Sequence, residues 1–107
     1  MTESKEHQPL TEAVYYILLA LHTPMHGYGI MQFTKEISNG RMNMGPGTLY
    51  GAIKTMLDKE WIQAIETEAG SRKKEYEITP TGKKVVQDEI DRLQELVKNG
   101  NRITRSE

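Results

Sequence analysis

The segment from Leu10 to Leu21 is the most apolar part of this 107-residue chain and constrains its fold more than any other feature. Its large side chains recur at the spacing of an amphipathic helix, and the remaining positions add a second apolar face. A helix that is apolar nearly all round must be covered on both sides. Because a chain of this length builds one small domain, we expect a second copy of the chain to supply part of the cover. The first face carries Leu10, Ala13, Val14, Ile17, Leu18 and Leu21, and the second carries Tyr15, Tyr16, Leu19 and Ala20.

Glycine, proline and asparagine divide the rest of the chain into further elements. Asn39-Gly40 favours a helix end, Gly45-Pro46 favours a helix start, and Thr79-Pro80 favours a capped one. Gly100 is the natural stop of the last helix. In order, we expect a turn at 22–27, a helix over 28–38, a brief extended segment at 41–44, a helix from 46 to about 59, a hairpin over 61–78 with Tyr76 and Ile78 facing inward, and a helix over 80–100.

This order predicts a mainly α-helical fold with a small β-hairpin wing, that is, a winged helix-turn-helix followed by a C-terminal dimerisation helix. The last helix carries Val86, Ile90, Leu93 and Val97 at a 4-3-4 spacing. Such a narrow apolar stripe is typical of a coiled coil, and a monomer has no need of it. The expected division is a tail over 1–9, a DNA-binding domain over 10–79, a dimerisation helix over 80–100 and a tail over 101–107.

The helix after Gly45-Pro46 has the character of a DNA-reading helix. A helix of this kind fits the major groove and brings its N-terminal half close to the base edges. Gly51 costs about 1 kcal/mol relative to alanine in a helix, which is understandable if a larger side chain would collide with nucleic acid. The alternative is that these are ordinary solvated positions. The outward positions are Thr48, Gly51, Lys54, Thr55 and Asp58, with Tyr50 at the flank.

Positive charge is concentrated in the middle of the chain, although the net charge is −1. Residues 41–84 hold eight basic and six acidic side chains, and the densest group is Arg72, Lys73 and Lys74. These three residues fall at the hairpin tip, where cations can contact phosphates or enter the minor groove. A groove-reading helix and a cationic wing together predict binding to double-stranded DNA.

Three motifs give the chain a family resemblance. They are His26-Gly27-Tyr28-Gly29-Ile30, then Gly47-Thr48-Leu49-Tyr50, then 72–79 (RKKEYEIT) followed by Gly82. In this order they resemble the PadR family of bacterial transcriptional regulators, over about residues 10–97. The resemblance implies a dimeric winged helix-turn-helix that binds an inverted-repeat operator, usually as a repressor. The single C-terminal helix is similar to the compact branch of the family, some of whose members sense drugs or small aromatic molecules.

The resemblance also assigns roles to individual residues. Tyr28 and Gly29 would open the second helix beside the DNA backbone, Thr48, Tyr50 and Lys54 would be recognition-helix contacts, and Arg72, Lys73 and Lys74 would form the wing. Glu60 stands where the family usually has glycine, which predicts a differently built end of the third helix. The dimer interface would comprise Leu10, Val14, Ile17, Leu18, Leu21, Val86, Ile90, Leu93 and Val97.

Other functions find less support in the residues. There is no cysteine, and His7, His22 and His26 lack the partners of a metal site; His26 is expected to hydrogen-bond within its turn instead. No catalytic constellation or cofactor motif is present, and no apolar stretch is long enough to cross a membrane, so we expect a cytoplasmic protein that is not an enzyme. The competing interpretation is a dimeric winged-helix adaptor that binds proteins and never contacts DNA, which near-neutral charge and Asp58 favour.

Overall fold

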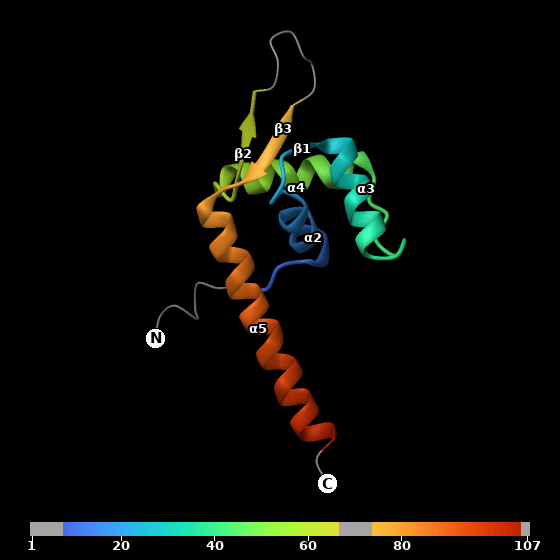
Figure 1. Cartoon of the computed structure of the whole chain (residues 1–107), viewed down its shortest axis with the longest axis vertical. Helices are drawn as coiled ribbons and strands as arrows, with labels where there is room; N and C mark the ends of the chain where they lie inside the picture. Colours follow the sequence, from blue (N-terminus) through green and yellow to red (C-terminus); the bar gives the residue numbers. More distant parts are fainter. Residues whose placement is uncertain (1–7, 67–73, 106–107) are drawn as a thin grey trace.

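The computed structural model describes residues 8–66 and 74–105, and in these residues the chain forms four helices and three strands (Figure 1). The elements are α2 (Glu12–Ala20), β1 (Met25–His26), α3 (Gly27–Ile37), α4 (Pro46–Asp58), β2 (Ile62–Ile65), β3 (Glu75–Ile78) and α5 (Pro80–Thr104). The first three helices gather around one core beside the small sheet. Helix α5 begins at the base of the β2–β3 hairpin and runs away from the hairpin (Figure 1). The expected mainly helical fold with a small antiparallel sheet is confirmed.

Helix α2 and its C-terminal cap residue Leu21 lie at the centre of the core. Ile17, Leu18 and Leu21 are completely buried. Since apolar burial is the main favourable contribution to folding, the rest of the domain assembles around these side chains. Cover by a second copy stays a prediction for the rest of α2, since Tyr15 and Leu19 keep accessible surface, whereas Ile17, Leu18 and Leu21 are covered by the same chain. Their neighbours in the core are Ile30, Leu49, Ile53, Met56, Ile62, Tyr76, Ile78 and Val86.

The sheet has the strand order β1-β3-β2, and both strand pairs are antiparallel. Two expectations about strands are wrong. The segment predicted as a turn contains the strand Met25–His26, and the expected extended segment at 41–44 forms no strand. Two residues carry no strand pattern of their own, so β1 exists only because β3 lies beside it, pairing Met25 with Tyr76 and His26 with Glu75. The inward orientation predicted for Tyr76 is confirmed by its burial.

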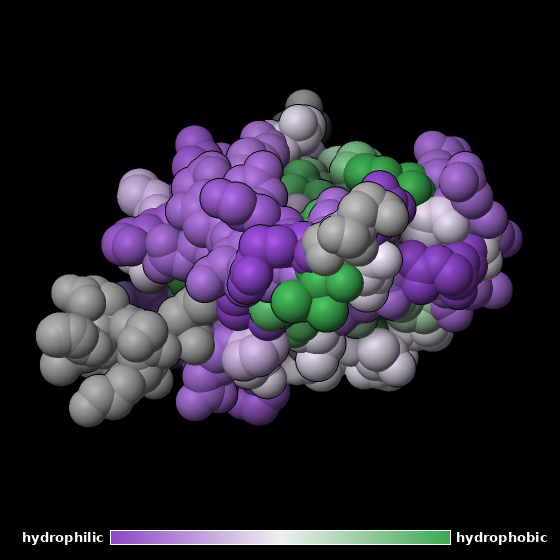
Figure 2. Space-filling model, turned by 90° about the horizontal axis from the view of Figure 1, so that it is seen from below, coloured by the Kyte–Doolittle hydropathy of each residue, from purple (hydrophilic) through white to green (hydrophobic). Residues whose placement is uncertain are grey.

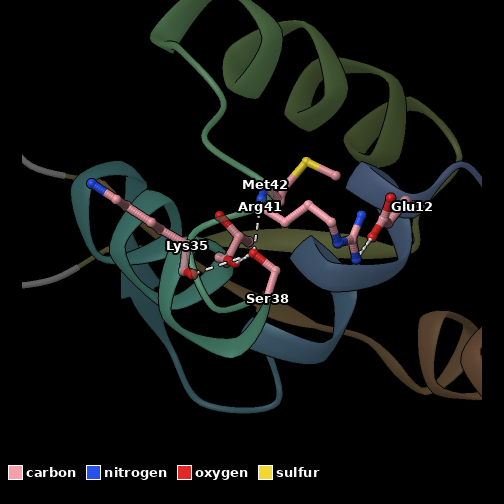
Figure 3. A network of polar contacts seen from close by, with 6 residues as sticks. Glu12, Lys35, Ser38, Arg41 and Met42 are labelled. Atoms are coloured by element: carbon pink, nitrogen blue, oxygen red, sulfur yellow. Dashed lines mark hydrogen bonds and ion pairs between the residues drawn. The ribbon is translucent and has the colours of Figure 1, made fainter.

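Side chains, not strand pairing, hold the segment between α3 and α4 (Figure 3). The Ser38 hydroxyl donates a hydrogen bond to the Thr34 carbonyl oxygen (2.8 Å) and accepts one from the Met42 N–H (2.8 Å). Arg41 reaches back to α2 and forms an ion pair with Glu12. The hydrogen bond from Arg41 lowers the pKa of the Glu12 carboxyl below its ordinary value. These contacts fix the turn that sets the angle between α3 and α4.

Helix α4 ends on a residue with left-handed backbone, Glu60, whose φ is 64°. The Glu60 N–H bonds to the Leu57 carbonyl oxygen (3.0 Å) and the Trp61 N–H bonds to the Met56 carbonyl oxygen (3.0 Å), which together close the helix in a Schellman motif. The expectation of a differently built helix end is therefore wrong. The geometry is the one that glycine favours, and Glu60 adopts it against its steric preference.

We predict that Glu60→Gly stabilises the protein by about 1 kcal/mol, because glycine adopts the left-handed conformation without a Cβ penalty. The matched control is Lys59→Gly at the preceding position, where φ is −86° and glycine brings only its entropic cost, so this variant should lose about 0.5–1 kcal/mol. Urea denaturation followed by circular dichroism measures both. Equal effects of the two substitutions would contradict the strain assigned to Glu60.

The junction between β3 and α5 is tightly packed around Thr79 and Gly82. Thr79 caps α5 by accepting a hydrogen bond from the Gly82 N–H (3.0 Å), and its own N–H donates to the Trp61 carbonyl oxygen (2.9 Å). A Cβ on Gly82 would lie 2.2 Å from that same oxygen. A backbone atom held in a hydrogen bond cannot move aside cheaply, so this position requires glycine.

We predict that Gly82→Ala destabilises the protein by about 1–3 kcal/mol, the usual cost of forcing an extra methyl group into a packed site. Gly51→Ala, at a helical glycine whose Cβ would meet nothing within 4 Å, is the control and should gain about 0.5–1 kcal/mol. Thermal and urea unfolding report both values. A Gly82→Ala variant as stable as the unmodified chain would refute the close approach.

Helix α5 continues through Gly100 to Thr104, so the expected stop at Gly100 is wrong. Glycine weakens a helix by about 1 kcal/mol but ends it only when it adopts the left-handed conformation, and Gly100 does not. The Thr104 hydroxyl instead donates to the Gly100 carbonyl oxygen (2.8 Å). Residues 101–104 of the expected C-terminal tail are thus helical, while 1–7 of the expected N-terminal tail and 106–107 lie outside the described residues.

Candidate nucleic-acid interface

Helix α4 presents one face to the core and the opposite face to solvent. Its buried face is Leu49, Ile53 and Met56. The residues expected to read DNA are all exposed on the other side, as the periodicity predicts. These exposed residues are Thr48, Tyr50, Gly51, Lys54, Thr55 and Asp58.

The glycines on the exposed side of α4 have no role in the packing of this chain. A Cβ added at Gly47 or Gly51 would meet no atom within 4 Å, so neither position needs glycine for folding. Glycine in a helix is less stable than alanine by about 1 kcal/mol. The packing of the described residues therefore gives no reason for glycine at position 51.

The N-terminus of α4 lacks a side-chain cap. Gly45 occupies the capping position, and Pro46 follows at the first helical position. The first N–H groups of a helix have no partner within the helix, and together with the helix dipole they form a favourable environment for an anion. An approaching phosphate would meet these donors next to the exposed Thr48.

Tyr50 of α4 lies against the first turn of α3. A Cβ on Gly27 would sit 2.1 Å from the Tyr50 hydroxyl oxygen, so Gly27 makes room for this ring. The ring is still 48% exposed, and Tyr28 in the same turn of α3 is 63% exposed. The fold thus brings both tyrosines that the sequence nominated to the place where the starts of α3 and α4 meet. Burial raises the pKa of the neighbouring Tyr76 hydroxyl, with a smaller contribution from Tyr50.

His26 and Gly29 hold the start of α3. The His26 ring nitrogen Nδ1 accepts a hydrogen bond from the Gly29 N–H (3.3 Å), which confirms the expected hydrogen bond within the turn. The Tyr28 hydroxyl accepts a hydrogen bond from the Gln32 side-chain nitrogen (2.7 Å). His26 therefore positions the first turn of α3, and Tyr28 remains available at the surface.

The wing contributes one described cation. Lys74, next to strand β3, is exposed, whereas Arg72 and Lys73 lie outside the described residues. The following residue, Glu75, is half-buried and pairs across the sheet with His26 on one side and Ile65 on the other. The structure thus fixes the base of the wing against the start of α3.

Two charged residues on α4 pair with each other. Lys54 Nζ lies 3.8 Å from Asp58 Oδ2, one helical turn further along. The Thr55 hydroxyl on the same face bonds back to the Gly51 carbonyl oxygen (3.3 Å). The i, i+4 spacing of Lys54 and Asp58 is the sequence signal for this pair, which was not among the expectations from the sequence.

The nine residues expected at a dimer interface divide into two groups. Ile17, Leu18, Leu21 and Val86 are buried within the single chain and have almost no surface left for a partner. The other five retain accessible surface. They are Leu10, Val14, Ile90, Leu93 and Val97.

The outer half of α5 carries two further exposed apolar side chains that were not expected from the sequence. Leu96 and Ile103 are 53% and 67% exposed, beside the expected Val97 at 61%, and the seven-residue spacing of Leu96 and Ile103 is the signal that could have found them. Viewed from below, the molecule shows apolar patches within a mostly hydrophilic surface (Figure 2). We call the exposed apolar side of residues 90–103 the α5 arm.

An open cavity of about 550 Å³ lies where the α5 arm passes α2. Its walls combine Tyr15 of α2 with the apolar stripe of α5, and they include three polar side chains of α5, those of Gln94, Lys98 and Asn101. The residues around it are Tyr15, Ile90, Leu93, Gln94, Val97, Lys98 and Asn101.

Within 8–66 and 74–105, no group of three or more histidine, aspartate or glutamate side chains is placed to hold a metal ion. In the same part of the chain, no helix has the length and apolar character needed to span a membrane.

A helix-turn-helix with an exposed second helix, a β-hairpin beside it and a long terminal helix define a winged helix-turn-helix protein. The transcriptional regulator PadR-like family matches residues 16–88. The chain therefore belongs to this family, as the resemblance predicts.

Three individual proteins are similar to this chain. A PadR family transcription regulator from Clostridium difficile has 22% identity and a TM-score of 0.73, with 87% of this chain and 98% of that one covered. Bacillus subtilis PadR in complex with operator DNA has 28% identity and a TM-score of 0.64, covering 75% of this chain and 47% of that one. A 37.1 kDa protein of a Streptomyces fradiae transposon is 30% identical over 86 residues, which are 79% of this chain but only 24% of that protein.

Proposed function

We propose that the chain is a cytoplasmic homodimeric repressor that binds an inverted-repeat operator in double-stranded DNA. In this proposal residues 10–79 contact DNA, and α5 joins the two copies. Helix α4 enters the major groove, Tyr28, Gly29 and Tyr50 contact the phosphate backbone, and Arg72, Lys73 and Lys74 contact the DNA from the wing.

The observation that carries the proposal is the exposed face of α4. Thr48, Lys54 and Thr55 point away from the core beside a glycine that the chain itself does not require. Small and polar side chains with one cation suit a helix in the major groove, where hydroxyls can contact either bases or phosphates. The PadR of Bacillus subtilis, which shares this fold, has been solved with operator DNA, and that supports the same use of α4 here.

The α5 arm supports the dimer. Three large apolar side chains stand more than half exposed along one helix, Leu96, Val97 and Ile103, and exposed apolar side chains that line one face indicate an interaction surface. A two-fold arrangement of the arms would present two α4 helices to one duplex, at half-sites about one helical turn apart.

The cavity beside Tyr15 supports an effector site at the same place. In our proposal a small aromatic or drug-like molecule binds between the α5 arm and α2. Such pockets are mostly apolar with a few polar groups that orient the ligand. A ligand there would change the spacing of the two reading helices and so favour a state with lower DNA affinity.

A dimeric adaptor that binds another protein is the second candidate. Asp58 on the exposed face of α4 and the net charge of −1 favour it, because both weaken attraction to phosphate. The adaptor would keep its activity after charge reversal on α4, whereas a repressor would not.

We predict that Lys54→Glu lowers affinity for the operator by about tenfold or more. The slope of log affinity against log salt concentration should also become shallower by the contribution of about one phosphate contact. The operator can be obtained by letting the unmodified protein select from a pool of random duplexes. Lys84→Glu is the matched control, because Lys84 also pairs with an aspartate at i+4, Asp88, but lies on α5, which leads away from the wing (Figure 1). Fluorescence anisotropy at several salt concentrations gives both quantities.

Equal affinity of the unmodified protein for its selected duplex and for random DNA would refute sequence-specific binding. Unchanged binding by Lys54→Glu would show that this face of α4 does not contact DNA and would favour the adaptor.

We predict that Val97→Asp raises the dimer dissociation constant by about tenfold or more, because a carboxylate without a partner would be placed in an apolar interface. Asn99→Asp adds the same group about half a helical turn away from Val97 and should leave the dimer intact. Sedimentation velocity across a range of concentrations measures both. If the unmodified chain is monomeric at micromolar concentration, the dimer proposal fails.

A further inference from the structure

Asp58 is a negative charge on the face of α4 that faces solvent. It shares this face with Gly51, Lys54 and Thr55, since the four positions follow the i, i+3, i+4, i+7 spacing of one helical stripe. Both members of the Lys54–Asp58 pair are largely exposed, with 80% and 71% of their side-chain surfaces accessible.

The pair is poorly placed to stabilise the helix. Asp58 is the last residue of α4, where the negative end of the helix dipole disfavours a carboxylate. The order lysine then aspartate is also the weaker orientation for an i, i+4 pair. Exposed ion pairs contribute little to stability in any case. The folding of the chain therefore supplies no reason for an aspartate at this position.

A second lysine–aspartate pair in the chain, Lys84 and Asp88 on α5, has closer contacts than the Lys54–Asp58 pair. Lys84 and Asp88 have the same order and spacing, but both carboxylate oxygens accept from the lysine, at 3.1 and 3.3 Å. Asp88 also lies in the first half of α5, farther from the negative end of its helix. The Lys54–Asp58 contact, at 3.8 Å, is long by comparison, so Lys54 can leave it easily when another anion approaches.

The effect of Asp58 on DNA binding follows from its charge. On the operator, the correct contacts of α4 would hold Lys54 against a phosphate, so that Lys54 exchanges the Asp58 carboxylate for that phosphate. On random DNA these contacts are missing, so Lys54 would stay paired with Asp58, and the carboxylate would face the DNA backbone as a like charge. The repulsion would therefore weaken the non-specific complex more than the specific one.

We propose that Asp58 is a specificity-determining residue, which pairs with Lys54 in the free protein and repels the backbone of DNA that lacks the operator sequence. The inference rests on the proposed DNA-binding function. Repulsive elements of this kind discriminate between partners by weakening the wrong complexes. The negative charge of Asp58, taken alone, favours the adaptor function, whereas in this proposal it contributes to DNA recognition.

Another role for Asp58 would be direct base reading, in which its carboxylate accepts a hydrogen bond from a cytosine amino group. The two roles predict opposite results when the charge is removed. Loss of a base contact lowers operator affinity and leaves random DNA unaffected, whereas loss of repulsion raises affinity for random DNA.

The test compares Asp58→Asn with the unmodified protein on two duplexes, the selected operator and a random sequence of equal length. We expect affinity for the random duplex to rise by about threefold to tenfold, with a salt slope steeper by about 0.9, as Lys54 gains a phosphate contact. Operator affinity should rise less, so the ratio of specific to non-specific affinity falls. Asp88→Asn on α5 is the matched control and should change neither affinity.

An unchanged ratio, or a loss confined to the operator, would overturn the role of Asp58. The double variant Lys54→Ala/Asp58→Asn adds a second check, because the gain on random DNA should shrink when Lys54 is absent. If the unmodified protein selects no operator, the proposed function itself fails. If it selects one and Asp58→Asn preserves the ratio, only this inference fails.

Discussion

The burial of α2 is the constraint on which the rest of the structure depends. Ile17, Leu18 and Leu21 are completely enclosed, and the Leu21 carbonyl oxygen accepts a hydrogen bond from the Ile78 N–H (2.8 Å). One short helix therefore anchors the helical core through its side chains and the sheet through its backbone. The ion pair of Arg41 with Glu12 adds the turn before α4 to the same anchor. The orientation of α4 thus depends on contacts made with α2.

The glycines of the chain include some that the packing requires and some that it does not. Gly27 and Gly82 are required internally, because a Cβ would collide with Tyr50 and with the Trp61 carbonyl oxygen respectively. Gly47 and Gly51 have open space around them. Gly100 of α5 is likewise helical and has open space around it. A residue that weakens a helix and fills no packing need indicates a constraint from outside the chain, and two of these three glycines lie on α4, where DNA contact is proposed.

Local signals in the sequence predicted most of the helical framework and the outward face of α4. Thr79 caps α5, Pro46 begins α4 and His26 caps α3, because each of these roles depends on residues within one turn. Strand β1 could not be predicted, since Met25 and His26 become a strand only through pairing with β3. The pattern also could not tell which chain covers α2, because periodicity reports that a face is apolar and not which surface meets it.

By itself the sequence determined the order of the helices and the hairpin, the two faces of α4 and the membership of the PadR-like family, because periodicity, caps and motifs are properties of neighbouring residues. Only the tertiary structure decided that Ile17, Leu18 and Leu21 are enclosed by their own chain, that Tyr50 rests on Gly27 and that the exposed apolar surface lies on the outer half of α5. These facts depend on contacts between residues far apart in the chain. Their energies come from surfaces meeting in space, which no local pattern specifies.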